Sequence, residues 1–139
     1  MAKVGGVVLT HGHFGQELLS AAEMVVGEIP HVVAVSIGWH SEVETARHEI
    51  ERAIAQVSRG SGVLLLTDMF GGTPTNIAGM FLDDQTVEVL TGVNLPMLVK
   101  LATCGDHEEL SQVTEQILQS GRSGIYSAGN LLAVGKTKK

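Results

Sequence analysis

The chain has 139 residues, of which 44% are hydrophobic and 17% charged, and its formal net charge is −6. This composition favours one globular domain, which we expect over residues 1–135, followed by a frayed basic tail over residues 136–139. The acidic balance argues against a nucleic-acid partner. No apolar run reaches the roughly 18–20 residues of a membrane span. With Cys104 as the single cysteine, we expect a cytoplasmic protein that reaches a membrane only through separate components.

Four short apolar runs alternate with segments of helical spacing. The runs are rich in valine, isoleucine and leucine, which is typical of strands buried on both faces of a parallel sheet. They cover residues 4–10, 31–37, 63–67 and 86–90. This alternation predicts an α/β fold, in which an open, doubly wound, mainly parallel four-stranded sheet is flanked by helices.

Start and stop signals mark the first two helices. The apolar spacing that begins at Phe14 predicts a helix that Gly27 ends. Residues 41–44 form a capping-box pattern, with Ser41 as the expected N-cap of the second helix.

Two later signals mark the starts of further helices. Thr73 before Pro74 predicts the N-cap and first residue of a third helix. Asp106 and Glu109 resemble a cap pair that opens the last long helix. The apolar tail that follows, from Ile125 onward, is short and broken by glycine, so we expect it to need a sheet edge, either its own or a neighbour's.

Polar clusters follow three of the predicted strands. They are Thr10-His11-Gly12-His13, Gly38-Trp39-His40 and the segment Asp68 to Pro74. The carboxyl ends of parallel strands share one rim of the sheet, so His11 and Asp68 are expected to meet. A carboxylate bonded to one imidazole nitrogen fixes the tautomer and leaves the other nitrogen as a nucleophile.

The glycines after Asp68 add a place for an anion. Gly71, Gly72 and Thr73 stand at an expected helix start, where backbone N–H groups face an anion without a side chain between them. A histidine, an orienting carboxylate and an anion cradle together suggest phosphoryl transfer through a phosphohistidine. The sequence has no GxxxxGK[ST] pattern, so a nucleotide site lacks support.

Simpler interpretations stay open for these residues. His11 is alternatively a structural histidine, Asp68 a turn residue, and the two glycines an aid to close packing. A metal site would combine His11 and His13 with His40 or Asp68, but a spacing of two is less typical of zinc ligands than i, i+4. His31, His48 and His107 are expected in solvent.

Three segments together resemble the IIA component of the mannose family of the phosphoenolpyruvate-dependent sugar phosphotransferase system (PTS). They are Thr10-His11-Gly12, the segment from Asp68 to Asn76, and the segment from Thr91 to Met97. They occur in the order and spacing of the family, and the resemblance extends over almost the whole chain.

The resemblance implies roles for the polar clusters. His11 would accept a phosphoryl group from the phosphorylated histidine-containing phosphocarrier protein and pass it to a IIB component. Asp68 would bond to the other imidazole nitrogen, and Gly72 and Thr73 would help to hold the phosphoryl oxygens. No metal or other cofactor is implied. The family fold also implies a homodimer whose C-terminal strand is exchanged between subunits.

Partner-facing residues are expected beside the histidine. His13 holds a position that other residues, including aromatic ones, often occupy in the family. Phe70 replaces a bulky aromatic residue that some members have at this position. With Trp39, these side chains are expected to face a protein partner. Alternatives to sugar transport are a phosphorylation-dependent signalling module, a dihydroxyacetone kinase phosphotransfer subunit and, least favoured, a small metal-dependent hydrolase.

Overall fold

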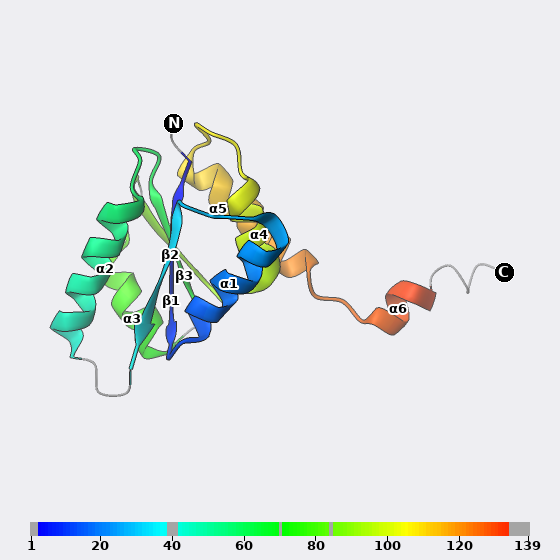
Figure 1. Ribbon diagram of the computed structural model, residues 1–139, viewed down its shortest axis with the longest axis horizontal. Coiled ribbons are helices and arrows are strands. Elements are labelled where there is room, and N and C mark those ends of the chain that lie inside the picture. Colours follow the sequence, from blue (N-terminus) through cyan, green and yellow to red (C-terminus); the bar gives the residue numbers. More distant parts are fainter. Residues whose placement is uncertain (1–2, 39–41, 70, 84, 134–139) are drawn as a thin grey trace.

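Four parallel strands form the sheet of the computed structural model, which describes residues 3–38, 42–69, 71–83 and 85–133. The strands lie in the order β2-β1-β3-β4 (Figure 1). Their bounds are Gly5–His11 for β1, Val32–Ile37 for β2, Val63–Thr67 for β3 and Val87–Thr91 for β4. The predicted open, parallel four-stranded sheet is confirmed, with each strand within a residue of the expected start or end.

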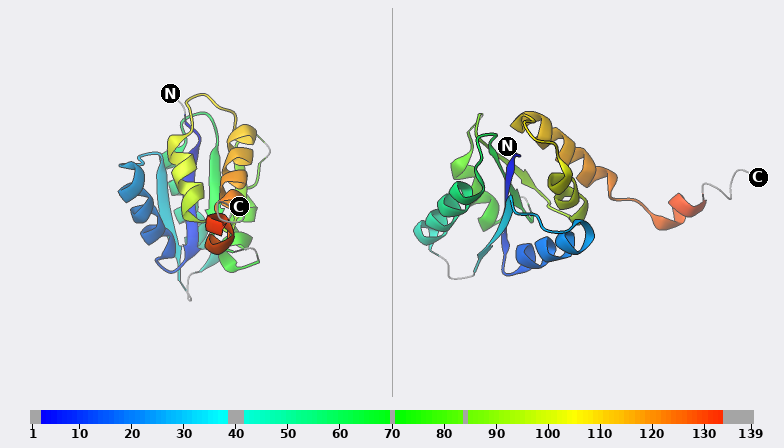
Figure 2. Two further views of the ribbon diagram at one scale, coloured as in Figure 1. Left: turned by 90° about the vertical axis from the view of Figure 1, so that its right-hand side faces the viewer. Right: turned by 45° about the horizontal axis from the view of Figure 1, so that its top comes forward.

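Helices cover both faces of the sheet, as predicted. On one face lie α1 (Phe14–Val26), α4 (Leu95–Thr103) and α5 (Leu110–Ser123). On the other lie α2 (Val43–Val57) and the short α3 (Thr73–Ala78), which continues into the 3₁₀ turn η1 (Gly79–Phe81). The two layers are visible on either side of the strands in Figures 1 and 2.

The two central strands are buried on both faces, which explains their uninterrupted apolar sequence. Val8 and Leu64 point into the cluster beneath α4 and α5. Their neighbours Val7 and Leu65 point into the opposite cluster, beneath α2. Because successive side chains of a strand alternate between faces, each residue of such a run has to be apolar. This burial fixes the register, and the register fixes where the strand ends meet.

Three helix starts differ from the sequence expectation. The N-cap of α2 is Glu42, whereas Ser41, expected in that role, lies outside the described residues. The N-cap of α5 is Glu109 alone, whose side chain forms a capping box with Gln112, and Asp106 lies outside the cap. The N-cap of α3 is Gly72, so Thr73 is already the first helical residue. In all three cases the residue that caps is the one whose backbone is extended just before the helix, which side-chain type alone does not reveal.

The C-terminal tail is not a strand in the single chain, contrary to expectation. Residues 125–127 have no regular structure, and α6 (Ala128–Ala133) is a short helix. The tail projects away from the sheet and reaches neither of its outer strands (Figures 1 and 2). Without a strand to pair with, the backbone makes local hydrogen bonds instead, as from the Leu131 N–H to the Ser127 carbonyl. Exchange of this segment between subunits stays a prediction.

His31 is buried, so the expectation that it is in solvent is wrong. Its side chain precedes β2 and is only 8% exposed, and Nε2 lies 3.1 Å from the carbonyl oxygen of Leu101 in α4. Burial lowers the pKa of His31, and the nearby charges of Lys3 and Arg59 lower it further, against an opposing effect of the Leu101 carbonyl. His48 and His107 are exposed, as expected.

The buried His31 predicts a loss of stability in mild acid. A histidine whose pKa is lowered by folding resists a proton that the unfolded chain accepts, so stability falls as the pH drops below about 6.5. We expect the free energy of unfolding to decrease by up to about 1.4 kcal/mol per pH unit in that range. Urea unfolding at a series of pH values measures this slope.

His31→Gln should flatten that slope, whereas His107→Gln, which changes an exposed histidine, should leave it as in the wild type. Equal slopes for His31→Gln and the wild type would show that His31 does not carry the effect.

Candidate active site

The topology brings His11 and Asp68 together. His11 is the last residue of β1, and Asp68 directly follows β3. The two strands are neighbours, and between them the chain changes direction across the sheet: β2 lies on one side of β1, and β3 and β4 lie on the other. Such switch points leave a crevice at the carboxyl ends of the strands. The predicted meeting of the two side chains is therefore a consequence of strand order.

The Asp68 carboxylate holds His11 by two hydrogen bonds. Oδ2 lies 2.8 Å from Nδ1 of the ring and also accepts the backbone N–H of His11 at 3.0 Å. The other oxygen, Oδ1, accepts the N–H of Met69 at 3.0 Å. An ionised carboxylate only accepts hydrogen bonds, so Nδ1 carries the proton and Nε2 has the lone pair.

The charge and exposure of the pair suit a nucleophile. Burial raises the pKa of Asp68, but the hydrogen bonds from the ring and backbone of His11 outweigh it, and the pKa lies below its usual value. Asp68 is therefore ionised at neutral pH. Its side chain is 14% exposed, whereas that of His11 is 51% exposed. Within the described part of the chain, the ring makes its one hydrogen bond through Nδ1, and Nε2 is left for a reaction.

Gly72 lies against the reactive edge of the ring. A Cβ at this position would be 2.9 Å from Cε1 of His11 and 3.3 Å from Nε2. The backbone of Gly72 is extended, with φ −87°, so the close approach and not the backbone angle requires glycine. Gly71, by contrast, has φ +90° and stands in open space. Thr73 follows as the exposed first residue of α3.

The side chain of Thr10 holds the turn after His11 in place. This fully buried residue accepts the N–H of Gly15 on its hydroxyl oxygen at 2.7 Å. A Cβ on Gly15 would lie 3.0 Å from that oxygen, so the start of α1 packs directly on the end of β1. Sequence reasoning missed both roles, although a buried threonine ending an apolar run and a glycine opening a helix were visible signals.

Sequence reasoning also missed two residues that support the loop after Asp68. The hydroxyl groups of Thr67 and Thr75 are 2.7 Å apart, and Thr75 also contacts the carbonyl of Met69. A threonine on each side of the glycine loop was the only sign of this pairing in the sequence.

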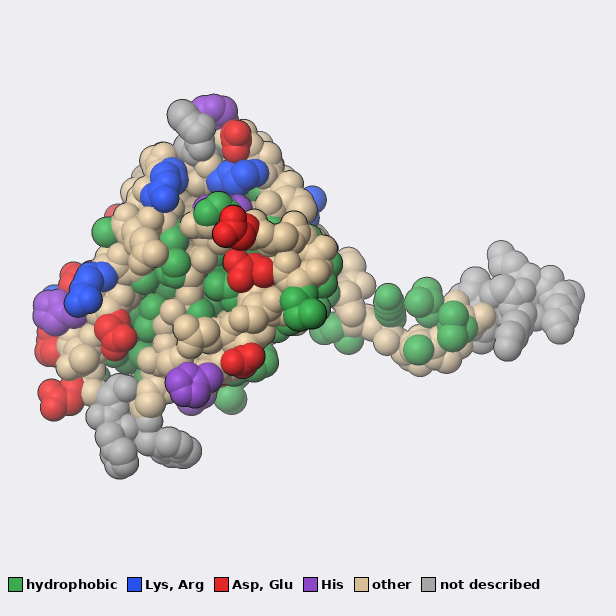
Figure 3. All heavy atoms as spheres, in the orientation of Figure 1, with side chains coloured by type: hydrophobic (Ala, Val, Ile, Leu, Met, Phe, Trp, Pro, Cys, Tyr) green, Lys and Arg blue, Asp and Glu red, His purple; other side chains and the backbone are tan. Residues whose placement is uncertain are grey.

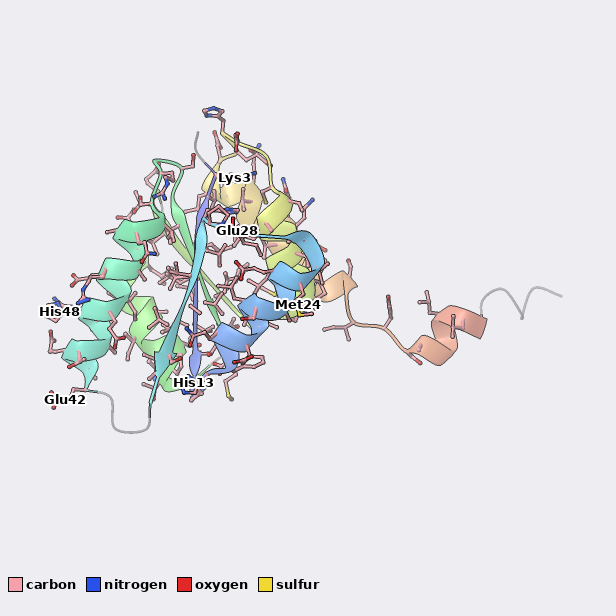
Figure 4. All side chains as sticks on the ribbon, in the orientation of Figure 1. Lys3, His13, Met24, Glu28, Glu42 and His48 are labelled. Carbon is pink, nitrogen blue, oxygen red and sulfur yellow. The ribbon has the colours of Figure 1, made fainter. Side chains whose placement is uncertain are left out.

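The predicted partner-facing residues are only partly described. His13 is exposed just before α1, at the lower end of that helix in Figure 4. Trp39 and Phe70 lie outside the described residues, as does His40. Among the side chains that the structure describes, no group of three or more His, Cys, Asp or Glu is arranged to hold a metal ion. Phe14 and Met69, which follow His11 and Asp68 closely in the sequence, are 48% and 56% exposed and add apolar surface.

Family comparisons agree with this architecture. The family model described as "PTS system fructose IIA component" matches residues 5–118. The chain belongs to the PTS IIA proteins of the mannose and fructose family. The likeness to the IIA mannose family, inferred from the three motifs, is thereby confirmed.

Curated relatives come from several bacteria. The chain is 33% identical over 121 residues to the mannose-specific EIIAB component of Escherichia coli K12, and this match covers 86% of the chain but only 38% of that longer protein. It is 30% identical to the fructose-specific EIIA component of Bacillus subtilis 168, covering 80% of the chain and 77% of the relative. The chain thus corresponds to the IIA part of these systems.

Solved structures share the fold over nearly the whole length. The PTS IIA protein associated with the fucose utilization operon of Streptococcus pneumoniae has a TM-score of 0.80 at 29% identity, covering 95% of this chain and 99% of that one. The mannose/sorbose-specific IIA subunit of Enterococcus faecalis has a TM-score of 0.80 at 25% identity, covering 90% and 94%. Within the described residues, no helix is both long and apolar enough to cross a membrane.

The close approach at Gly72 predicts that Gly72→Ala disturbs His11 without unfolding the protein. The alanine backbone fits the extended conformation, but its Cβ would displace the ring from Asp68. We expect the ¹⁵N NMR signals of the His11 ring to shift toward a mixture of tautomers. Gly79→Ala, whose Cβ meets open space, is the matched control and should leave them unchanged. Identical ring signals in Gly72→Ala and the wild type would contradict the steric argument.

Proposed function

We propose that this IIA protein carries a phosphoryl group on Nε2 of His11, accepting it from the phosphorylated histidine-containing phosphocarrier protein and passing it to a IIB component. The observation that supports this most directly is the 2.8 Å contact between Nδ1 of His11 and Oδ2 of Asp68. In the neutral ring it places the proton on Nδ1 and the lone pair on Nε2, and a nucleophile that attacks a partner protein needs such a lone pair on an exposed side chain.

The transfer needs only the two imidazoles. The lone pair of Nε2 forms a bond to phosphorus while the bond from phosphorus to the donor's imidazole nitrogen breaks, and that electron pair stays on the donor. Nδ1 keeps its proton, so the phosphorylated ring gains positive charge. The ionised Asp68 beside it stabilises that charge. Transfer to the acceptor reverses these steps, and in-line positioning supplies most of the catalysis.

Gly71, Gly72 and Thr73 are proposed to hold the phosphoryl oxygens. Gly72 lies beside the Cε1 and Nε2 edge of the ring, where the group would be attached. The absence of a side chain there leaves room for the oxygens, and the exposed Thr73 offers a hydroxyl at the start of α3. Backbone N–H groups at such a start favour an anion.

The surface beside His11 is proposed to dock both partner proteins. Phe14 and Met69 contribute exposed apolar area next to the exposed His13. We place Trp39 and Phe70 on the same surface by their positions in the sequence. A partner that covers this area would also exclude water from the phosphoryl group during transfer.

Phosphorylation of this protein by a purified, reconstituted series of phosphotransfer proteins tests the proposal. With phosphoenolpyruvate, enzyme I and the phosphocarrier, the protein should gain one acid-labile phosphoryl group by intact mass. His11→Ala should abolish the gain, and Asp68→Asn should slow it about 100-fold because the ring loses its position and tautomer. His48→Ala, which removes an exposed histidine of α2, is the control. A phosphoryl group that survives His11→Ala would falsify the assignment.

We also propose that the protein is a homodimer that covers the C-terminal tail. Ile125, Tyr126, Leu131 and Leu132 are 52–76% exposed. Figure 3 shows hydrophobic atoms on the segment that projects from the body of the chain. Apolar side chains gathered in this way need a partner surface. The outer strands β2 and β4 each pair with one strand of the sheet, so the other edge of each, apart from Val87, which pairs with Asp83, offers a place for a strand of a second copy.

Substitution in the tail should therefore separate the subunits. We expect Ile125→Ser combined with Tyr126→Ser to shift the sedimentation mass toward that of one chain, 14.7 kDa. Met24→Ser removes an apolar side chain that is 90% exposed on α1 and should leave the dimer intact. A wild-type protein that sediments as a monomer would rule the dimer out.

A further inference from the structure

A chain of hydroxyl groups runs beneath the candidate site. Thr75, the third residue of α3, places its Oγ1 2.5 Å from the carbonyl oxygen of Met69. The same Oγ1 lies 2.7 Å from Oγ1 of Thr67, the last residue of β3. Thr67 is fully buried and Thr75 half-buried, so the contact between the two hydroxyl groups is partly shielded from water, whereas the contact with Met69 lies at the surface.

The direction of this chain follows from counting protons. A threonine hydroxyl has one proton to donate, and a carbonyl oxygen only accepts. Thr75 therefore donates to Met69, and Thr67 has to donate to Thr75. The result is a directed path from the buried end of β3 through α3 to the exposed loop that follows Asp68.

Hydrogen bonds hold the backbone on both sides of Asp68, and the hydroxyl path supplies one of them. On one side, the carbonyl of Thr67 accepts the N–H of Val93 at 2.9 Å, which anchors the end of β3. On the other side, Met69 is held at its carbonyl by Thr75, while its N–H donates to Oδ1 of Asp68. With Oδ1 engaged in this way, Oδ2 is the oxygen directed at His11.

Thr75 also belongs to the helix that Gly72 opens. The carbonyl of Gly72 accepts the N–H of Asn76 at 3.0 Å, so Gly72 is tied to the first turn of α3. The hydroxyl of Thr75 thus links two parts that have to keep a set distance: the carboxylate on one side of the His11 ring and the glycine on its other edge.

We propose that Thr75, supported by Thr67, is a positioning residue for the reaction at His11. It does not touch the reacting atoms, and it acts by holding Asp68 and the glycine turn in place around the ring. This inference rests on the proposed phosphoryl transfer, but the effect on the ring itself does not require a phosphoryl donor. Even small displacements of His11 relative to Asp68 are expected to lower the rate of transfer steeply.

Thr75→Val keeps the size of the side chain and removes the hydroxyl, and Thr75→Ser keeps the hydroxyl. We expect Thr75→Val to lower the rate of phosphorylation by the phosphocarrier about 10- to 100-fold. In the same variant, the ¹⁵N NMR signals of the His11 ring should show a larger fraction of the tautomer protonated on Nε2. Thr75→Ser should restore both readouts. Thr67→Val should have a smaller effect, because Thr75 still donates to Met69.

Thr103→Val is the matched control. Its hydroxyl also donates to backbone carbonyls, those of Val99 and Lys100, but at the far end of α4. This variant should leave rate and tautomer unchanged. If Thr75→Val retains the wild-type rate and tautomer, even with reduced thermal stability, the positioning role is overturned. If the wild type accepts no phosphoryl group, the proposed function fails, and the NMR comparison still decides the role of Thr75.

Discussion

The hydrogen bond between His11 and Asp68 joins residues 57 positions apart, and it depends on two strands ending at the same place. β1 and β3 are paired in parallel, with Leu9 opposite Thr67. A shift of one residue in this pairing would turn every side chain of a strand to the opposite face. The buried apolar side chains of both strands prevent such a shift. The core of the protein is thus what sets the distance between the imidazole and the carboxylate.

Around that bond, the local structure leaves one edge of the ring open. Asp68 holds Nδ1 and the backbone of His11, Thr10 fixes the turn into α1, and the missing side chain of Gly72 leaves space beside Nε2. Both oxygens of the Asp68 carboxylate are already engaged, Oδ2 with His11 and Oδ1 with the N–H of Met69. An arrangement of this kind needs little reorganisation when a charged group arrives, which is the condition for electrostatic stabilisation of a transferred phosphoryl group.

The body of the protein is well packed, whereas its C-terminal tail is not. Up to Ala133, where the described residues end, the tail carries exposed apolar side chains, and its backbone hydrogen bonds are local, as from Leu131 to Ser127. In the body, the apolar side chains of the two central strands are completely buried on both faces of the sheet. The second subunit that we propose would resolve this contrast by supplying a surface for the tail. The same difference explains why an apolar pattern that suggests a strand forms a short helix when it has no partner.

Much of the fold and half of the site could be predicted from local pattern. The strand runs, the helix from Phe14 to its stop at Gly27 and the pairing of His11 with Asp68 follow from hydrophobic period and from the geometry of parallel sheets. The cap residues of α3 and α5 could not be predicted in the same way, because several polar neighbours compete for one backbone position. His31 was misplaced because its burial depends on α4, which is distant in sequence.

The sequence by itself determined the alternation of strands and helices, the family and, to within one residue, the ends of the strands, since these depend on neighbours along the chain. Only the tertiary structure decided that Gly72 touches the ring of His11, that His31 is buried under α4 and that Thr67 and Thr75 hold the loop after Asp68. Each of these is a contact between separate elements. Their distances depend on how the strands and helices pack, and no local pattern carries that information.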